Sequence, residues 1–207
     1  MGQYNEETLY VVSGHQRCGT SMMMDCLIKG GWGYEAEYDV GREEFRKEHA
    51  DEHYDPNENG LYELAREEYM KPSFPRGYEG KLIKALNEGS KNMMPMDGGI
   101  RYVYMRRPYD QIRRSWRAFF GRAIPHTANA TEHELWQERI IQHLQNRKDA
   151  LSVDVFWYPR VVDDPLRHLE ILRSNGWPID VRRAAGVVDS DLFRHTHKHE
   201  PEIEKSE

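Results

Sequence analysis

A short apolar strand, a polar loop bounded by glycines and an apolar helix follow one another within the first thirty residues of the chain. Leu9–Ser13 is apolar and rich in β-branched residues, which is typical of a buried strand. The loop at 14–19 begins and ends with glycine, and the methionine-rich segment from Thr20 to about Lys29 predicts a helix that ends at a glycine pair. We expect Thr20 or Ser21 to cap this helix. A buried strand joined to a helix in this way indicates an α/β fold.

The rest of the chain alternates strand-like and helix-like segments. This alternation predicts a parallel sheet with helices on both faces. A chain of 207 residues can form one well-cored domain but is short for two, so we expect a single domain over 1–207. The further expected strands are 81–86, 101–106 and 153–158. The further expected helices are 42–50, 108–120, 131–150 with Thr131 as cap, and 164–174, and we expect a frayed polar tail at 196–207.

The glycine-bounded loop has the architecture of a phosphate-binding loop. Glycines let the backbone approach an anion, and the N-terminus of the following helix adds positive potential, with Thr20 and Ser21 as hydroxyl donors. The loop is not a Walker A motif, because Thr20 stands where that motif has lysine and the positive charge is at Arg17. This argues against an ordinary ATPase or GTPase. The alternative is a turn that only joins a core strand to a core helix.

Positive charge is concentrated in one segment of an otherwise acidic chain. The formal net charge is −6, so nonspecific nucleic-acid binding is not expected. Between Arg101 and Arg122 the only acid is Asp110, and this segment indicates a specific anionic ligand. The alternative is a solvated helix face. The arginines of the segment are Arg101, Arg106, Arg107, Arg113, Arg114, Arg117 and Arg122.

The sequence Val-Val-Ser-Gly-His-Gln-Arg-Cys-Gly-Thr-Ser resembles the 5′-phosphosulfate loop of sulfotransferases that use 3′-phosphoadenosine 5′-phosphosulfate (PAPS), in the small bacterial or phage form. The resemblance implies a three-layer sheet like that of P-loop NTPases. In the resemblance Arg17 contacts the phosphosulfate, and Cys18 replaces the usual serine, which leaves the backbone donors intact. The residues placed around the phosphosulfate are Gly14, Arg17, Cys18, Gly19, Thr20 and Ser21.

The strand at 101–106 and the proline-started helix after it resemble the second signature of the same family. In that family an arginine and a serine hold the 3′-phosphate, and Arg106 and Ser115 match the spacing of the subgroup most similar to this chain. The commoner spacing is one residue shorter and would put Arg114 at the serine position. A guanidinium and a hydroxyl suit a phosphate chemically. The alternative is that Arg106 and Arg107 only decorate a strand end.

Weaker resemblances to the family at 55–63, 80–84 and 185–194 extend the match over most of the chain. In these, Lys84 resembles the lysine that contacts the sulfonate, the alternative being a surface lysine. Arg17 and Lys84 would neutralise charge on the leaving side, so no metal is expected. Glu63 and His15 are the two candidates for the general base that takes the acceptor proton.

The expected function is transfer of the sulfuryl group of PAPS to an unidentified hydroxyl or amine of a small molecule, glycan or peptide, with adenosine 3′,5′-bisphosphate as product. One alternative is a non-catalytic protein that binds PAPS or the bisphosphate, and a less favoured one is a nucleotide kinase-like phosphotransferase. His195, His197 and His199 could bind a metal, but an incidental run in a polar tail is the simpler interpretation.

The sequence favours a protein without a membrane span in a reducing cytoplasm. It contains two cysteines, Cys18 and Cys26, which are too far apart along one segment to bridge. The first residues show no secretory pattern, and no apolar run approaches the roughly 20 residues of a membrane-spanning helix. The oligomeric state is not predicted.

Overall fold

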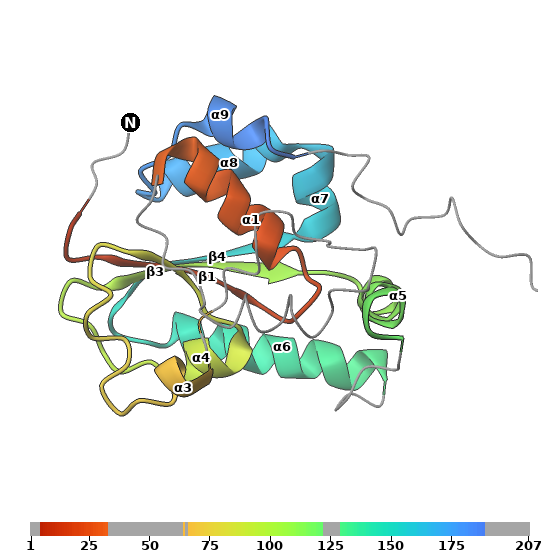
Figure 1. The fold of residues 1–207 in the computed structure, drawn as a ribbon, viewed down its shortest axis with the longest axis horizontal. Coiled ribbons are helices and arrows are strands. Elements are labelled where there is room, and N and C mark those ends of the chain that lie inside the picture. Colours follow the sequence, from red (N-terminus) through yellow and green to blue (C-terminus); the bar gives the residue numbers. More distant parts are fainter. Residues whose placement is uncertain (1–4, 33–63, 65, 122–128, 189–207) are drawn as a thin grey trace, which may run out of the picture.

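Four strands form one parallel sheet in the order β2-β1-β3-β4 (Figure 1). The structure, a computed structural model, describes residues 5–32, 64, 66–121 and 129–188. The strands are β1 Leu9–Gly14, β2 Leu82–Lys84, β3 Ile100–Arg106 and β4 Ala150–Trp157, and all their pairings are parallel. The α/β class and the parallel sheet predicted from the sequence are confirmed.

The strand register gathers the carboxyl ends of the strands at one edge of the sheet. Gly14 at the end of β1 pairs with Met105 of β3, and Arg106 pairs with Trp157 at the end of β4. On the other side of β1, β2 ends at Lys84. In open parallel sheets this edge is where ligands bind.

Helices lie on both sides of the sheet in Figure 1. One side carries α1 Thr20–Leu27, the π-helical turn η1 Ile28–Trp32, α7 Tyr158–Asp163, α8 Pro165–Ser174 and α9 Val181–Ala185. The other side carries α3 Arg66–Tyr69, α4 Asn87–Lys91 and α6 Ala130–Gln145. Helix α5 Tyr109–Phe120 lies beyond the carboxyl edge.

The sheet separates two buried clusters, because successive residues of a strand point to opposite faces. Val103 and Met105 of β3 belong to the cluster that contains the buried methionines of α1. Tyr102 and Tyr104 belong to the other cluster, together with Ile140 and neighbouring residues of α6. Val103 and Met105 of β3 therefore face α1, and Tyr102 and Tyr104 face α6.

The expected cap and end of α1 were wrong. Gly19, at φ 90°, is the N-cap, and no side chain caps the helix. Thr20 and Ser21 are instead the first two helical residues. The glycine pair does not end the helical segment either, because η1 continues through it. Gly31, at φ 128°, is the non-helical residue at which η1 kinks.

Helix α6 begins and ends earlier than expected. The side chain of Asn129 accepts a hydrogen bond from the N–H of Glu132 (3.0 Å), so Asn129, not Thr131, is the N-cap. Helices α4, α7 and α9 were not expected, because five or six residues are too few to establish a helical period. The expected helix at 42–50 and the tail at 196–207 lie outside the described residues.

Helix α5 was expected to begin at Pro108 and begins one residue later, with Pro108 as its N-cap; its C-cap is Gly121, at φ 63°. Its buried side carries Ile112, Ser115 and Trp116. Among the helices of the described segments, none has the length and apolar character that a membrane crossing needs.

Candidate functional site

The Gly14–Gly19 loop joins β1 to α1 and turns at three residues with positive φ: Gly14 (142°), Arg17 (67°) and Gly19 (90°). An ideal Cβ on Gly14 would lie 2.5 Å from the carbonyl oxygen of Met105, so a side chain has no room there. Left-handed residues between right-handed ones turn successive backbone N–H groups toward one concave side. The loop therefore has a backbone shape that favours anion binding.

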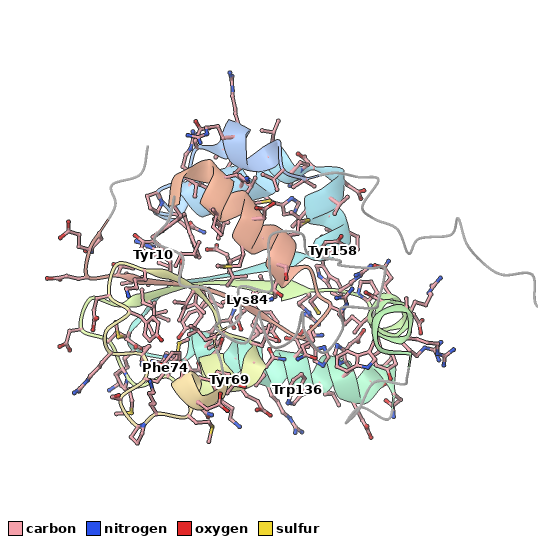
Figure 2. All side chains as sticks on the ribbon, in the orientation of Figure 1. Tyr10, Tyr69, Phe74, Lys84, Trp136 and Tyr158 are labelled. Atoms are coloured by element: carbon pink, nitrogen blue, oxygen red, sulfur yellow. The ribbon has the colours of Figure 1, made fainter. Side chains whose placement is uncertain are left out.

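The start of α1 adds a second set of donors and a buried cation. The first N–H groups of an α-helix have no intrahelical partner, and no side chain caps α1. The ammonium group of Lys84 donates to Ser21 Oγ (3.0 Å), and the lysine is only 3% exposed. Figure 2 shows Lys84 at the level of the sheet, below α1. Two sequence-predicted site residues from different elements, Lys84 and Ser21, are therefore in contact.

A second cluster of cations forms where the loop meets α5. Arg17 Nε donates to Ser115 Oγ (3.0 Å), and Ser115 is 1% exposed. The guanidinium of Arg107 donates through Nη1 to the carbonyl oxygen of Arg17 (3.2 Å) and through Nε to Gln111 (3.1 Å). Arg17 and Ser115, 98 positions apart in the chain, are thus direct neighbours.

Arg106 does not join this cluster and contacts α6 instead. Its Nε donates to Gln137 Oε1 (3.2 Å), its Nη1 forms an ion pair with Glu138, and its guanidinium lies 4.7 Å from the ring centroid of Trp157. The expected pairing of Arg106 with Ser115 is therefore not formed. The physical reason is strand alternation, which directs Arg106 to the same face as Tyr104.

Arg107, the next residue, contacts the loop and α5 instead, through Arg17 and Gln111. It is 8% exposed, and its guanidinium lies 4.6 Å from the ring centroid of Tyr158. Burial is the main cause that lowers the pKa of this guanidinium from its ordinary value, and the nearby positive charge of Arg114 lowers it further. Two signals could have pointed to Arg107: its position two residues after Met105, and its eight-residue distance from Ser115.

The side chains of Cys18 and Thr20 support the loop rather than face a ligand. Cys18 is fully buried, and burial raises the pKa of its thiol to about 12, so the thiol is neutral at pH 7. Thr20 is 4% exposed, and its methyl carbon lies 3.2 Å from the position that a Cβ on Gly14 would take. The backbone N–H of Cys18 donates to the carbonyl oxygen of His15 (3.2 Å), whereas Thr20, in the first turn of α1, could serve an anion through its backbone N–H.

His15 is surrounded by aromatic rings of α5 and α6. The ring centroids of His133, Trp136 and Trp116 lie 4.9, 5.6 and 6.3 Å from its own. Burial lowers the pKa of His15, so its imidazole is neutral at pH 7 and can accept a proton. Its Nδ1 lies 2.7 Å from the carbonyl oxygen of Gln16, and a proton on Nδ1 leaves Nε2 as the acceptor.

The second histidine of this cluster, His133, is fully buried. Burial, followed by the neighbouring His15 and Arg106, lowers its pKa to about 4. Its Nε2 contacts the side-chain amide of Gln137, and its Nδ1 has no hydrogen-bond partner. The sequence interpretation missed His133, since an isolated histidine on an amphipathic helix carries no signal of its own.

The other candidate base, Glu63, lies outside the described residues. The next residue, Leu64, donates its N–H to the carbonyl oxygen of Lys84 (3.2 Å). Within the described segments, no group of three or more histidine, cysteine, aspartate or glutamate side chains is arranged to hold a metal ion.

Comparisons with known proteins do not assign the chain to a family. No model of a known protein family matches the chain, and a search of curated proteins found no similar sequence. The residues of the site and their contacts therefore carry the functional inference.

Proposed function

We propose that the chain binds PAPS at the carboxyl edge of the sheet, in a P-loop-like three-layer α/β fold, and transfers its sulfuryl group to a hydroxyl or amine. The observation that carries this proposal is the presence of two groups of cationic and hydroxyl side chains at one glycine-bounded loop, one where the loop joins α1 and one around Arg17 within the loop. One is Lys84 with Ser21 at the start of α1, and the other is Arg17 with Arg107 and Ser115 before and on α5. A nucleotide with anionic groups at both its 5′ and 3′ positions would match two such clusters.

In this proposal the loop backbone, Ser21 and Lys84 hold the 5′-phosphosulfate. Arg107 and Ser115 hold the 3′-phosphate, with Arg107 replacing Arg106 in the role that the family resemblance suggested. Arg17 lies between the two groups, because its side chain reaches Ser115 while its backbone belongs to the loop. A planar guanidinium can donate two parallel hydrogen bonds to one phosphate, which suits Arg107 for this role.

The chemistry follows from these charges. The acceptor oxygen or nitrogen forms a bond to sulfur, while the bond between sulfur and the bridging phosphate oxygen breaks. Adenosine 3′,5′-bisphosphate leaves with that electron pair, and the acceptor proton passes to a base. Fixed cations such as Lys84 and Arg17 stabilise the negative charge that develops on the leaving oxygen.

The base is proposed to be either Glu63 or His15. A neutral imidazole with a free Nε2 supports His15. The resemblance of 55–63 to the acceptor-side segment of the family supports Glu63. Turnover of Glu63→Gln and His15→Gln with an accepted substrate separates the two, because only the variant that lacks the base should lose activity by about 100-fold or more. Full activity in both variants would exclude both residues.

We also propose that the protein works in a reducing compartment such as the cytoplasm. Cys18 and Cys26 are both free and buried, which suits a protein that is not exposed to oxidising conditions.

The nucleotide preference tests the proposed function. Thermal unfolding is measured with adenosine 3′,5′-bisphosphate, with 5′-AMP and with ATP. A ligand at about 100 times its dissociation constant adds about 2.7 kcal/mol, which for a domain of this size raises Tm by about 5–10 °C. A rise that is largest with the bisphosphate supports the proposal, and a screen for acceptors then distinguishes an enzyme from a binding protein. A rise in Tm with ATP alone would contradict the proposal, and so would the absence of a rise with all three nucleotides.

A further inference from the structure

Two arginines at the end of β3 each pack on an aromatic ring at the end of β4. Arg106 lies 4.7 Å from the ring centroid of Trp157, and Arg107 lies 4.6 Å from that of Tyr158. The register explains the first pair, because Arg106 and Trp157 are direct partners at the ends of β3 and β4, and Arg107 and Tyr158 are the residues that directly follow them. In Figure 2, Tyr158 lies on the α1 side of the sheet. The two pairs are alike in chemistry but differ in what else they touch.

Only the Tyr158 pair contacts the Gly14–Gly19 loop. An ideal Cβ on Gly19 would lie 2.1 Å from Cδ2 and 2.7 Å from Cε2 of Tyr158, so the ring packs directly against the backbone of Gly19. Arg107, which packs on the same ring, donates to the carbonyl oxygen of Arg17 (3.2 Å). The Trp157 pair instead connects to α6, through Gln137 and Glu138.

The two loop residues that Tyr158 and Arg107 contact are two of the three loop residues with positive φ. Arg17 has φ 67°, which is uncommon for a residue with a side chain, and Gly19 has φ 90°. For a residue with a side chain, such as Arg17, this conformation persists only when surrounding contacts hold it. Those contacts here include the hydrogen bond from Arg107, the ring of Tyr158 and the bond from Arg17 to Ser115.

We propose that Tyr158 is a positioning residue that holds the Gly14–Gly19 loop and the Arg107 guanidinium in the arrangement that binds the anion. Its ring acts by packing against Gly19 and by the cation–π contact with Arg107. The consequence for nucleotide binding rests on the proposed function, whereas the consequence for loop structure does not. Without the ring, the loop loses the contact at Gly19, and Arg107 loses the surface on which it is placed.

The buried cysteines give a test that needs no nucleotide. Cys18 lies inside the loop and Cys26 lies near the end of α1, both are fully buried, and burial raises the pKa of each thiol to about 12. The folded protein is treated with N-ethylmaleimide, and the labelling rate of each cysteine is followed by peptide mass spectrometry. Similar intrinsic reactivity makes the Cys18-to-Cys26 rate ratio a measure of local opening of the loop.

We expect Tyr158→Leu to raise this ratio by about tenfold or more, and Tyr158→Phe, which keeps the ring, to leave it near the wild-type value. Trp157→Leu is the matched control, because it removes the equivalent ring from the other arginine pair, and it should also leave the ratio unchanged. An unchanged ratio in Tyr158→Leu would overturn the proposal. A raised ratio in Trp157→Leu would overturn it as well, since the effect would then not be local to the Tyr158 ring.

Nucleotide titration of the same variants tests the second consequence. In Tyr158→Leu the preference for adenosine 3′,5′-bisphosphate over 5′-AMP should fall by about tenfold, because Arg107 is the residue proposed to meet the 3′-phosphate. Trp157→Leu should keep the wild-type preference. If the wild-type protein itself shows no preference, the proposed function fails, while the labelling ratio still decides whether Tyr158 supports the loop. A kept preference in Tyr158→Leu, with a raised labelling ratio, would overturn the part of the proposal that concerns Arg107.

Discussion

Replacing Gly19 with alanine measures how closely the loop packs on Tyr158. The change adds one methyl group at a residue with φ 90°, and the new Cβ would lie 2.1 Å from the ring. Two effects therefore add. A left-handed backbone costs a residue with a side chain about 1–2 kcal/mol, and overpacking at a carbon–carbon distance far below the optimum of about 3.5–4.0 Å costs about 1–3 kcal/mol more.

A second glycine provides a control for the backbone effect. Gly77 has φ 92°, and nothing lies within 4 Å of the Cβ that alanine would introduce there. Gly77→Ala should therefore lose only about 1–2 kcal/mol, whereas Gly19→Ala should lose about 2–5 kcal/mol. The difference between the two variants isolates the contact with Tyr158.

Urea unfolding followed by linear extrapolation gives both free energies. The background variant Tyr158→Ala extends the test, because removal of the ring should bring the loss from Gly19→Ala down to that from Gly77→Ala. Equal losses for the two alanine variants in the wild-type background would refute the packing argument. A loss from Gly19→Ala that persists without the ring would refute it too.

Three further predictions concern stability. The pKa of His133 is about 4 in the folded protein and about 6.5 in the unfolded chain, so the unfolded chain binds its proton first as the pH falls. The stability that neutral His133 contributes is therefore complete above pH 6.5 and is lost as the pH falls toward 4. Urea unfolding between pH 7.5 and 4.5 should show a loss of at most about 3 kcal/mol in unfolding free energy, and this loss should be absent in His133→Gln. Tyr104→Phe removes the 2.7 Å hydrogen bond to the buried Asn87 and should lower the unfolding free energy by about 1–2 kcal/mol, and no loss would contradict the bond. Asn129→Ala should lower it by about 1 kcal/mol through loss of the cap of α6, whereas Thr131→Ala, one residue into the helix, should lose less.

The strongest sequence patterns predicted the sheet well. The run at 9–13 contains two valines, and the core of 101–106 is Tyr-Val-Tyr-Met; β-branched and aromatic residues favour strands, and both runs are confirmed as β1 and β3. The same reasoning gave six residues to β2, which has three. A short edge strand carries too little periodicity for its ends to be located, and the same limit explains why α4, α7 and α9 were not foreseen.

The site was predicted only in part, and the reason is geometric. The sequence could place Ser115 near the loop because this required only the start of one helix, and Pro108 marks that start. The choice between Arg106 and Arg107 depends on which face of the sheet each one meets, and a one-residue difference reverses that face. Met105 faces the buried methionines of α1, and Arg107, two residues later, follows on the same side, whereas Arg106 follows Tyr104 on the α6 side.

The contact of Tyr158 with Gly19 could not be predicted from the sequence. The two residues are far apart in the chain, and Tyr158 reads as one more aromatic residue at the end of an apolar strand. The contact depends on the strand order β1-β3-β4, which places the loop after β1 near the end of β4, and on the turn into α7, and both are properties of the folded chain. Long-range contacts of this kind leave no local pattern.

A crystal structure of the protein with adenosine 3′,5′-bisphosphate would show which residues hold each phosphate. We expect the 5′-phosphate over the loop backbone, within hydrogen-bond distance of Ser21 and Lys84, and the 3′-phosphate between Arg107 and Ser115. Binding of the nucleotide elsewhere, or a 3′-phosphate held by Arg106 on the α6 side, would refute the proposed nucleotide site.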